Sequence, residues 1–60
     1  MYELSYVIDG NESFVGSGYT QKELKDLAKQ VVGSLKEIHY KKKITFWISL
    51  NDKILTEFTL

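Results

Sequence analysis

Lysine is the residue type that this sequence arranges in a pattern suited to binding chemistry. Seven of the eight lysines lie between positions 22 and 43, where only three acidic residues accompany them. This middle stretch therefore carries a net charge of +4, and the rest of the chain −4. On a helical projection the four lysines nearest the N-terminus fall within about 60° of one another. The lysine ribbon consists of Lys22, Lys25, Lys29, Lys36, Lys41, Lys42 and Lys43.

Three interpretations of the lysine ribbon stay open. Regularly spaced lysines can follow the phosphates of a nucleic acid, with Tyr40 or Trp47 stacking on its bases. They can also contact an acidic protein surface, or simply solvate a helix and guard the aggregation-prone strand ITFWISL that follows. The chain has no arginine, the residue that clamps phosphates and reads guanine edges. Nucleic-acid binding is therefore the alternative hypothesis and not the leading one.

The second candidate is Trp47, the only tryptophan of the chain. Strand alternation places it, together with Val7 and Leu55, on the face of the predicted sheet that points away from the helix. Exposed apolar patches with polar rims mark contact sites, and tryptophan is enriched in binding hot spots. We expect this face to bind a protein partner, either a second copy in a homodimer or a different protein. The plain alternative is cross-strand packing on a solvated face.

Catalysis finds little support in the sequence. His39 is the only histidine, and no motif ties a serine or a carboxylate to it. Glu23 and Asp26 lie one turn apart on a predicted exposed flank of a helix, where nothing shields them as an acid–base pair requires. The chain has no cysteine, which excludes a disulfide framework and a zinc knuckle. We predict a protein that is not an enzyme and that uses neither a metal nor another cofactor.

One amphipathic helix organises the predicted fold. Apolar residues recur at three- and four-residue steps from Leu24 onward, which gathers them on one side of a helix. Thr20 with Glu23 three positions later is the pattern of a capping box. We expect the helix to end near His39 and to continue through Gly33, although glycine costs about 1 kcal/mol relative to alanine inside a helix.

Strand patterns lie on both sides of this helix. Residues 2–8 alternate between apolar and polar, and residues 13–17 are predicted to return as a second strand after the turn at positions 9–12. The favoured register puts Phe14 in the core opposite Ile8. The glycine-containing stretch at positions 16–18 is interpreted as a flexible lead into the helix.

A second hairpin is predicted from residues 43–50 and 54–60. We favour a three-residue loop at positions 51–53, because its register makes one face of the hairpin almost wholly apolar. The opposed pairs are then Leu50 with Ile54, Ile48 with Thr56, Phe46 with Phe58, and Ile44 with Leu60.

The element order predicts one small α+β domain spanning residues 1–60. Its architecture is a two-layer ββαββ fold, in which the helix packs across one face of a mostly antiparallel four-stranded sheet. The order of the strands in the sheet stays open. A core of this size supplies only about 3–5 kcal/mol, so association with a second copy would add useful stability.

Composition completes the functional prediction. With 43% hydrophobic and 27% charged residues, the chain is typical of a globular fold. It has neither a run long enough to span a membrane nor the basic start of a signal peptide, so we expect a cytoplasmic location without membrane contact. We predict a small non-enzymatic protein-interaction module, of the accessory or inhibitory type found among phages and mobile elements, that self-associates through the outer sheet face.

Overall fold

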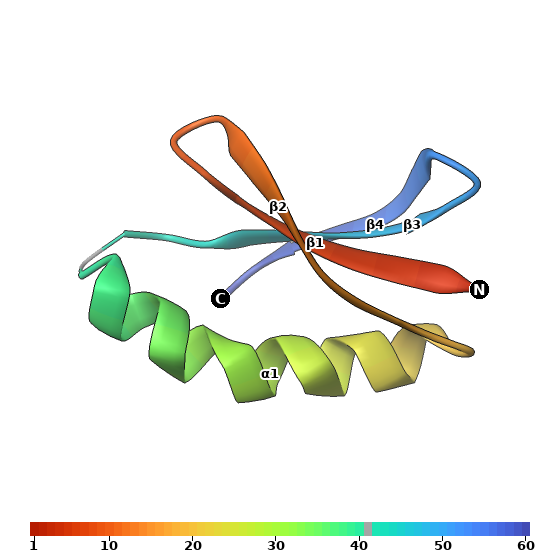
Figure 1. The fold of residues 1–60 in the computed structure, drawn as a ribbon, viewed down its shortest axis with the longest axis horizontal. Helices are drawn as coiled ribbons and strands as arrows, with labels where there is room; N and C mark the ends of the chain where they lie inside the picture. The colour runs from red at the N-terminus through yellow and green to blue at the C-terminus, as the bar shows by residue number, and fades with distance from the viewer. Residues whose placement is uncertain (41) are drawn as a thin grey trace.

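The computed structural model describes residues 1–40 and 42–60. Within these residues the chain forms β1 (Tyr2–Ile8), β2 (Asn11–Gly18), α1 (Gln21–Ile38), β3 (Thr45–Leu50) and β4 (Lys53–Thr59). The strands make one antiparallel sheet in the order β2-β1-β3-β4, and α1 lies across one of its faces (Figure 1). The predicted two-layer ββαββ fold is confirmed.

The two hairpins join through their first strands. β1 and β3 pair in the centre of the sheet, with Leu4 opposite Ile48 and Tyr6 opposite Phe46. This pairing settles the strand order that the sequence left open. Each hairpin is local in sequence, whereas the pairing of β1 with β3 brings together segments separated by the whole helix.

Both hairpins turn through two residues in the left-handed conformation. Asp9 and Gly10 have φ angles of 53° and 80°, and Asn51 and Asp52 have φ angles of 52° and 66°. Positive φ at both central residues is the mark of a type I′ turn, whose twist matches that of the strands it joins. The predicted three-residue loop at positions 51–53 is therefore wrong.

A bulge in β4 nevertheless restores most of the predicted register of the second hairpin. Leu55 has no residue opposite it in β3, and this extra residue shifts the pairing by one position. Beyond the bulge Phe46 lies opposite Phe58, as predicted. At the end of the hairpin Ile44 and Leu60 exchange backbone hydrogen bonds of 3.4 and 3.0 Å.

The register of the first hairpin differs from the prediction. The two-residue turn alone places Phe14 opposite Ser5, on the face of the sheet that points away from α1, because the bulge at Val15 comes only after this pair. The Phe14 side chain is 63% exposed, so its predicted place in the core is wrong. Val15 packs against the core instead. Since a slip of one residue reverses the face of every side chain, the tight turn is the physical reason for the difference.

The helix begins and ends close to the predicted positions. The Thr20 hydroxyl accepts a hydrogen bond from the Glu23 backbone N–H at 3.2 Å, which caps the first turn. At the other end the backbone N–H of His39 donates to the Leu35 carbonyl at 2.8 Å. The helix runs through Gly33 without interruption.

The end of β2 passes close beneath the start of α1. A Cβ atom added to Gly16 would lie 3.1 Å from Leu27 Cδ2, and one added to Gly18 would lie 3.3 Å from Leu24 Cδ2. The sequence analysis interpreted residues 16–18 as a flexible lead into the helix. The structure instead places them in β2. Glycine at these positions lets strand and helix approach each other.

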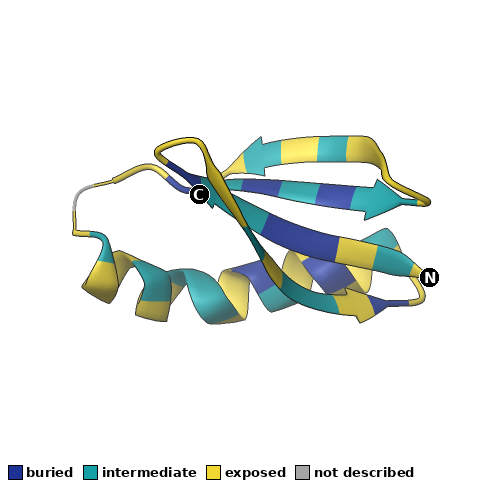
Figure 2. Ribbon diagram, turned by 45° about the horizontal axis from the view of Figure 1, so that its top comes forward, coloured by how far each residue is buried: buried dark blue, intermediate teal, exposed yellow. Residues whose placement is uncertain are grey.

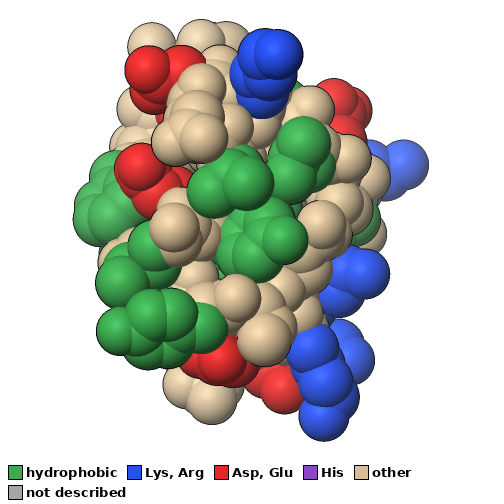
Figure 3. Space-filling model, turned by 90° about the vertical axis from the view of Figure 1, so that its right-hand side faces the viewer, with side chains coloured by type: hydrophobic (Ala, Val, Ile, Leu, Met, Phe, Trp, Pro, Cys, Tyr) green, Lys and Arg blue, Asp and Glu red, His purple; other side chains and the backbone are tan. Residues whose placement is uncertain are grey.

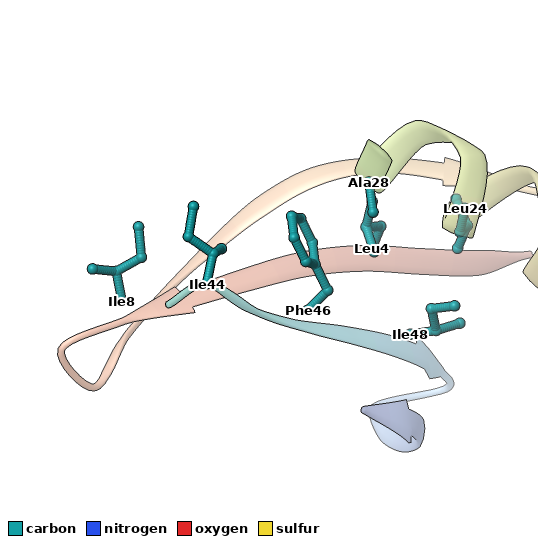
Figure 4. Close-up of a cluster of buried hydrophobic side chains, with 7 residues drawn as sticks. All are labelled: Leu4, Ile8, Leu24, Ala28, Ile44, Phe46 and Ile48. Atoms are coloured by element: carbon teal, nitrogen blue, oxygen red, sulfur yellow. The ribbon is translucent and has the colours of Figure 1, made fainter. Parts of the chain in front are cut away.

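The core lies between α1 and the two central strands. Figure 2 shows that most of the buried residues lie in β1, β3 and the first half of α1, whereas the last half of the helix is less covered. Ile38, in the last turn, is 74% exposed. The Phe46 and Phe58 rings stack with their centroids 5.5 Å apart. The buried apolar residues, drawn in Figure 4, are Leu4, Ile8, Leu24, Ala28, Ile44, Phe46 and Ile48.

Candidate functional site

The outer sheet face, which points away from α1, carries a row of side chains that crosses all four strands. Ser5 in β1 lies opposite Phe14 in β2 and opposite Trp47 in β3, and Trp47 lies opposite Glu57 in β4. Residues that face each other across strands have Cβ atoms only about 4.5–5.5 Å apart. The row therefore places one of the smallest side chains between two aromatic ones.

Trp47 is held in the middle of this face. Its indole N–H donates to the Glu57 carboxylate at 3.2 Å. The tryptophan side chain is half-buried, so it combines cross-strand packing with a surface that remains accessible. A tryptophan whose N–H is already bonded within its own sheet presents its apolar ring to an incoming group.

Further apolar side chains extend the surface around Trp47. Val7, half-buried, lies two positions from Ser5 on the same face of β1. Ile54 and Leu55, each about half exposed, lie at the bulge of β4. Val7, Trp47 and Leu55 were the residues that the sequence predicted on this face. Strand alternation next to Thr56, which bonds the helix, also directs Leu55 outward.

Sequence reasoning missed two apolar members of this surface, Phe14 and Ile54. Both were predicted to face the helix, and in both cases the two-residue turn reverses the face, because each residue lies between the turn and the bulge. The signal that could have found them is the pair of dipeptides Asp9-Gly10 and Asn51-Asp52, which are typical of type I′ turns.

A hollow of about 220 Å³ opens on this surface above Ser5. Its floor and one wall come from Ser5, Ser49 and Trp47, and three carboxylates, one from each of β1, β2 and the β3–β4 turn, surround it. The small serine side chains of the two central strands leave the space that the larger neighbours enclose. The lining residues are Glu3, Ser5, Glu12, Trp47, Ser49, Asp52 and Ile54.

The lysines of the helix lie on the opposite layer of the molecule. The Thr56 hydroxyl donates to the Gln21 side-chain oxygen at 2.7 Å, which places the Gln21 side of α1 over β4. Lys25 lies one turn further along that side. Figure 3 shows lysines along one edge of an end view, with hydrophobic side chains over the middle and the other side. The lysine flank, exposed throughout, consists of Lys22, Lys25, Lys29 and Lys36.

The rest of the predicted lysine ribbon does not continue the lysine flank as a uniform row. Lys42 forms an exposed ion pair with Asp9, in the turn between β1 and β2. Lys43 is exposed, and Lys41 lies outside the described residues. The flank on α1 is thus the part of the ribbon that the structure gathers on one surface.

His39 lies beside a second, smaller hollow at the far end of α1. This hollow, of about 170 Å³, is lined by the first hairpin and the half-buried His39. Asp9 is the carboxylate that also lines it, and it pairs with Lys42. The exposed Glu23 and Asp26 lie on α1, outside both hollows.

Comparison with known proteins leaves the site to be interpreted from its own geometry. No protein-family model matches the chain, and no curated protein or solved structure does either. In the part of the chain that the structure describes, no group of three or more His, Cys, Asp or Glu side chains could hold a metal ion. No helix among residues 1–40 and 42–60 has the length and apolar character needed to cross a membrane.

Proposed function

We propose that this protein is a small, non-enzymatic interaction module that docks its outer sheet face onto another protein. The observation that carries the proposal is the row through Phe14, Ser5 and Trp47, which no described element covers. Monomeric proteins scatter single apolar residues over their surfaces, but contiguous patches with a polar rim mark interaction sites. Here Phe14, Ile54 and Leu55 expose about half of their surface or more around a fixed tryptophan.

The occupant of this face is a protein surface, either of a second copy of the chain or of a different protein. Homodimerisation remains a prediction, motivated by the small core, since domains of this size gain stability from association. A cytoplasmic location and an accessory or inhibitory role of the phage or mobile-element type likewise remain predictions from size and composition.

The test compares substitutions on and off the outer face. We expect Trp47→Ala and Leu55→Ser to weaken association at least ten-fold, because tryptophan at the centre of a contact carries a large share of its free energy. Ile38→Ala is the matched control, since Ile38 is more exposed than Leu55 but lies at the end of α1. Far-UV circular dichroism of each variant reports whether the helix is intact.

Two measurements compare association in the wild-type chain and in the three variants. Sedimentation equilibrium of the wild-type chain gives its oligomeric state, and capture from a nuclease-treated lysate at high salt gives a heterologous partner. Association that is lost in Trp47→Ala and Leu55→Ser, and kept in Ile38→Ala, supports the proposal. Association that all three variants retain contradicts it, because the outer face would then not be the contact.

The lysine flank supports a second candidate function, nucleic-acid binding. Four exposed lysines lie on one side of α1, while the exposed acidic residues of the helix lie on another side. If these lysines contact four phosphates of a duplex, the logarithm of the binding constant should fall with the logarithm of the salt concentration with a slope of about −3.6. Changing Lys25, Lys29 and Lys36 to glutamate should abolish this binding, and Lys53→Glu, in the β3–β4 hairpin, is the control. Binding that does not respond to salt would exclude this function.

A further inference from the structure

The charged side chains that the four described strands and the β3–β4 turn place on the outer face are acidic. Glu3, Glu12 and Glu57 project from β1, β2 and β4 on this face, since each lies opposite an outward-facing residue of the neighbouring strand. Asp52, in the β3–β4 turn, joins Glu3 and Glu12 at the rim of the hollow. The lysines of α1 lie on the other layer. A partner that covers this face must therefore compensate negative charge.

The floor of the hollow holds a polar group that has no partner within the protein. Ser5 is only 6% exposed, and its hydroxyl makes no hydrogen bond to any residue in the described ranges. It faces the hollow that Trp47 and the carboxylates enclose. Among the described residues no side-chain N or O atom is both fully buried and unbonded, so the Ser5 oxygen is still accessible, and it can accept a hydrogen bond from a group in the hollow. The hollow is thus suited to a group that donates hydrogen bonds.

The carboxylates around the hollow suit an organic cation better than a metal ion. No cluster of three or more metal-ligating side chains occurs in the described chain, so the carboxylates surround the hollow without converging on one point. Glu57 is already bonded to the Trp47 indole, which fixes the ring. A cation that lies over a tryptophan ring is attracted by its π electrons, and a guanidinium carries several donors in one plane.

We propose that the occupant of the outer face is a basic segment of a different protein, which inserts an arginine or lysine side chain into the hollow above Ser5. This inference rests on the proposed function, that the outer face docks onto a protein. The inserted cation lies against Trp47, donates to the Ser5 hydroxyl and is neutralised by Glu3, Glu12 and Asp52. The exposed apolar side chains of Phe14, Ile54 and Leu55 contact the rest of the segment.

A second copy of the chain fits this surface less well. Face-to-face pairing would bring the carboxylates of both copies into one interface, and like charges across an interface oppose association. Insertion of a lysine from the α1 flank of another copy would be head-to-tail, which builds open chains of molecules and not a closed dimer. A basic partner avoids both difficulties.

The experiment uses Trp47 as its own reporter, because it is the only tryptophan in the 60-residue sequence. The probe is an acetylated and amidated peptide of alternating valine and arginine, titrated while Trp47 fluorescence is recorded. The matched probe replaces each arginine by citrulline, which keeps the shape and removes the charge. We expect the citrulline peptide to bind at least five-fold more weakly. Glu3→Gln and Glu12→Gln should each weaken binding of the arginine peptide about two- to five-fold.

The control variant is Glu37→Gln, which removes the same charge from α1, away from the outer face, and should bind like the wild type. Equal binding of both peptides overturns the basic-partner inference but leaves docking through the apolar face intact. A wild-type dimer that needs Trp47 and tightens in Glu3→Gln also overturns it, with a second copy as the occupant. If neither peptide changes the fluorescence, and the chain is monomeric and captures no protein, both the inference and the proposed function fail.

Discussion

Replacing Gly33 and Gly10 by alanine, one at a time, should change stability in opposite directions. Apart from the neighbouring residues of the chain and the backbone of the helix itself, a Cβ atom at either position would have no atom within 4 Å, so neither substitution creates a tertiary contact or a clash. The two sites differ in backbone conformation, because Gly33 lies inside α1 and Gly10 has a φ of 80° in the β1–β2 turn. The pair therefore isolates the backbone contribution of glycine.

The magnitudes follow from these two conformations. Alanine is better than glycine in a helix interior by about 1 kcal/mol, so Gly33→Ala should stabilise the fold by that amount. In the left-handed conformation a side chain costs about 1–2 kcal/mol, of which reduced freedom of the unfolded chain offsets about 0.4–1 kcal/mol. Gly10→Ala should therefore destabilise by about 1 kcal/mol. Each change corresponds to a shift of about 4–8 °C in Tm for a domain of this size.

Thermal and urea unfolding, followed by far-UV circular dichroism, measure both variants. The difference between them, about 2 kcal/mol, is a large part of the total stability that a 60-residue core supplies. If Gly33→Ala were neutral or destabilising, the helix would not continue through this position in solution. If Gly10→Ala were stabilising, the turn would not be of type I′, and the register of the first hairpin would need revision.

Three further substitutions test the cap, the core and the exposed ion pair. Thr20→Ala removes the hydroxyl that accepts a hydrogen bond from the N–H of the third helical residue. It should lower the free energy of unfolding, measured by urea denaturation, by about 1 kcal/mol, whereas Thr20→Ser should leave it nearly unchanged. Phe46→Ala empties a fully buried site at a cost of about 3–5 kcal/mol, so its circular dichroism at 25 °C should be that of an unfolded chain, and a folded spectrum would contradict the assigned core. Lys42→Gln removes the partner of Asp9, but with side chains 47% and 64% exposed the loss should stay below about 1 kcal/mol and vanish in 1 M salt.

The helix and the central strands could be predicted from the sequence because their signals are local and repeated. Apolar spacing located α1, and the Thr20 cap gave its start to within one residue. In the second hairpin the requirement for one apolar face gave the pairing of Phe46 with Phe58. That pairing held although the predicted loop was wrong, since the bulge adds one residue where the turn removes one.

The bulges and the outer face could not be predicted in the same way. A bulge has no periodic signal, because it interrupts a strand at one position only. Phe14 and Ile54, expected toward the helix, contribute to the outer face because each lies between a two-residue turn and the bulge, where the turn alone sets the register. Trp47 was placed correctly on the outer face, whereas the unpartnered Ser5 hydroxyl depends on three-dimensional enclosure that no pattern of residue types reveals.

Both bulges lie in the edge strands of the sheet, and this position has a consequence for aggregation. An edge strand offers unpaired backbone groups to other chains, and a bulge interrupts the regular ladder on which a further strand would pair. Val15 interrupts β2 and Leu55 interrupts β4. The most amyloid-like segment of the chain, β3 (Thr45–Leu50), is paired on both sides in the interior of the sheet. At high concentration the folded protein should therefore resist growth into fibrils by strand addition, and fibrils should form only under conditions that separate β4 from β3.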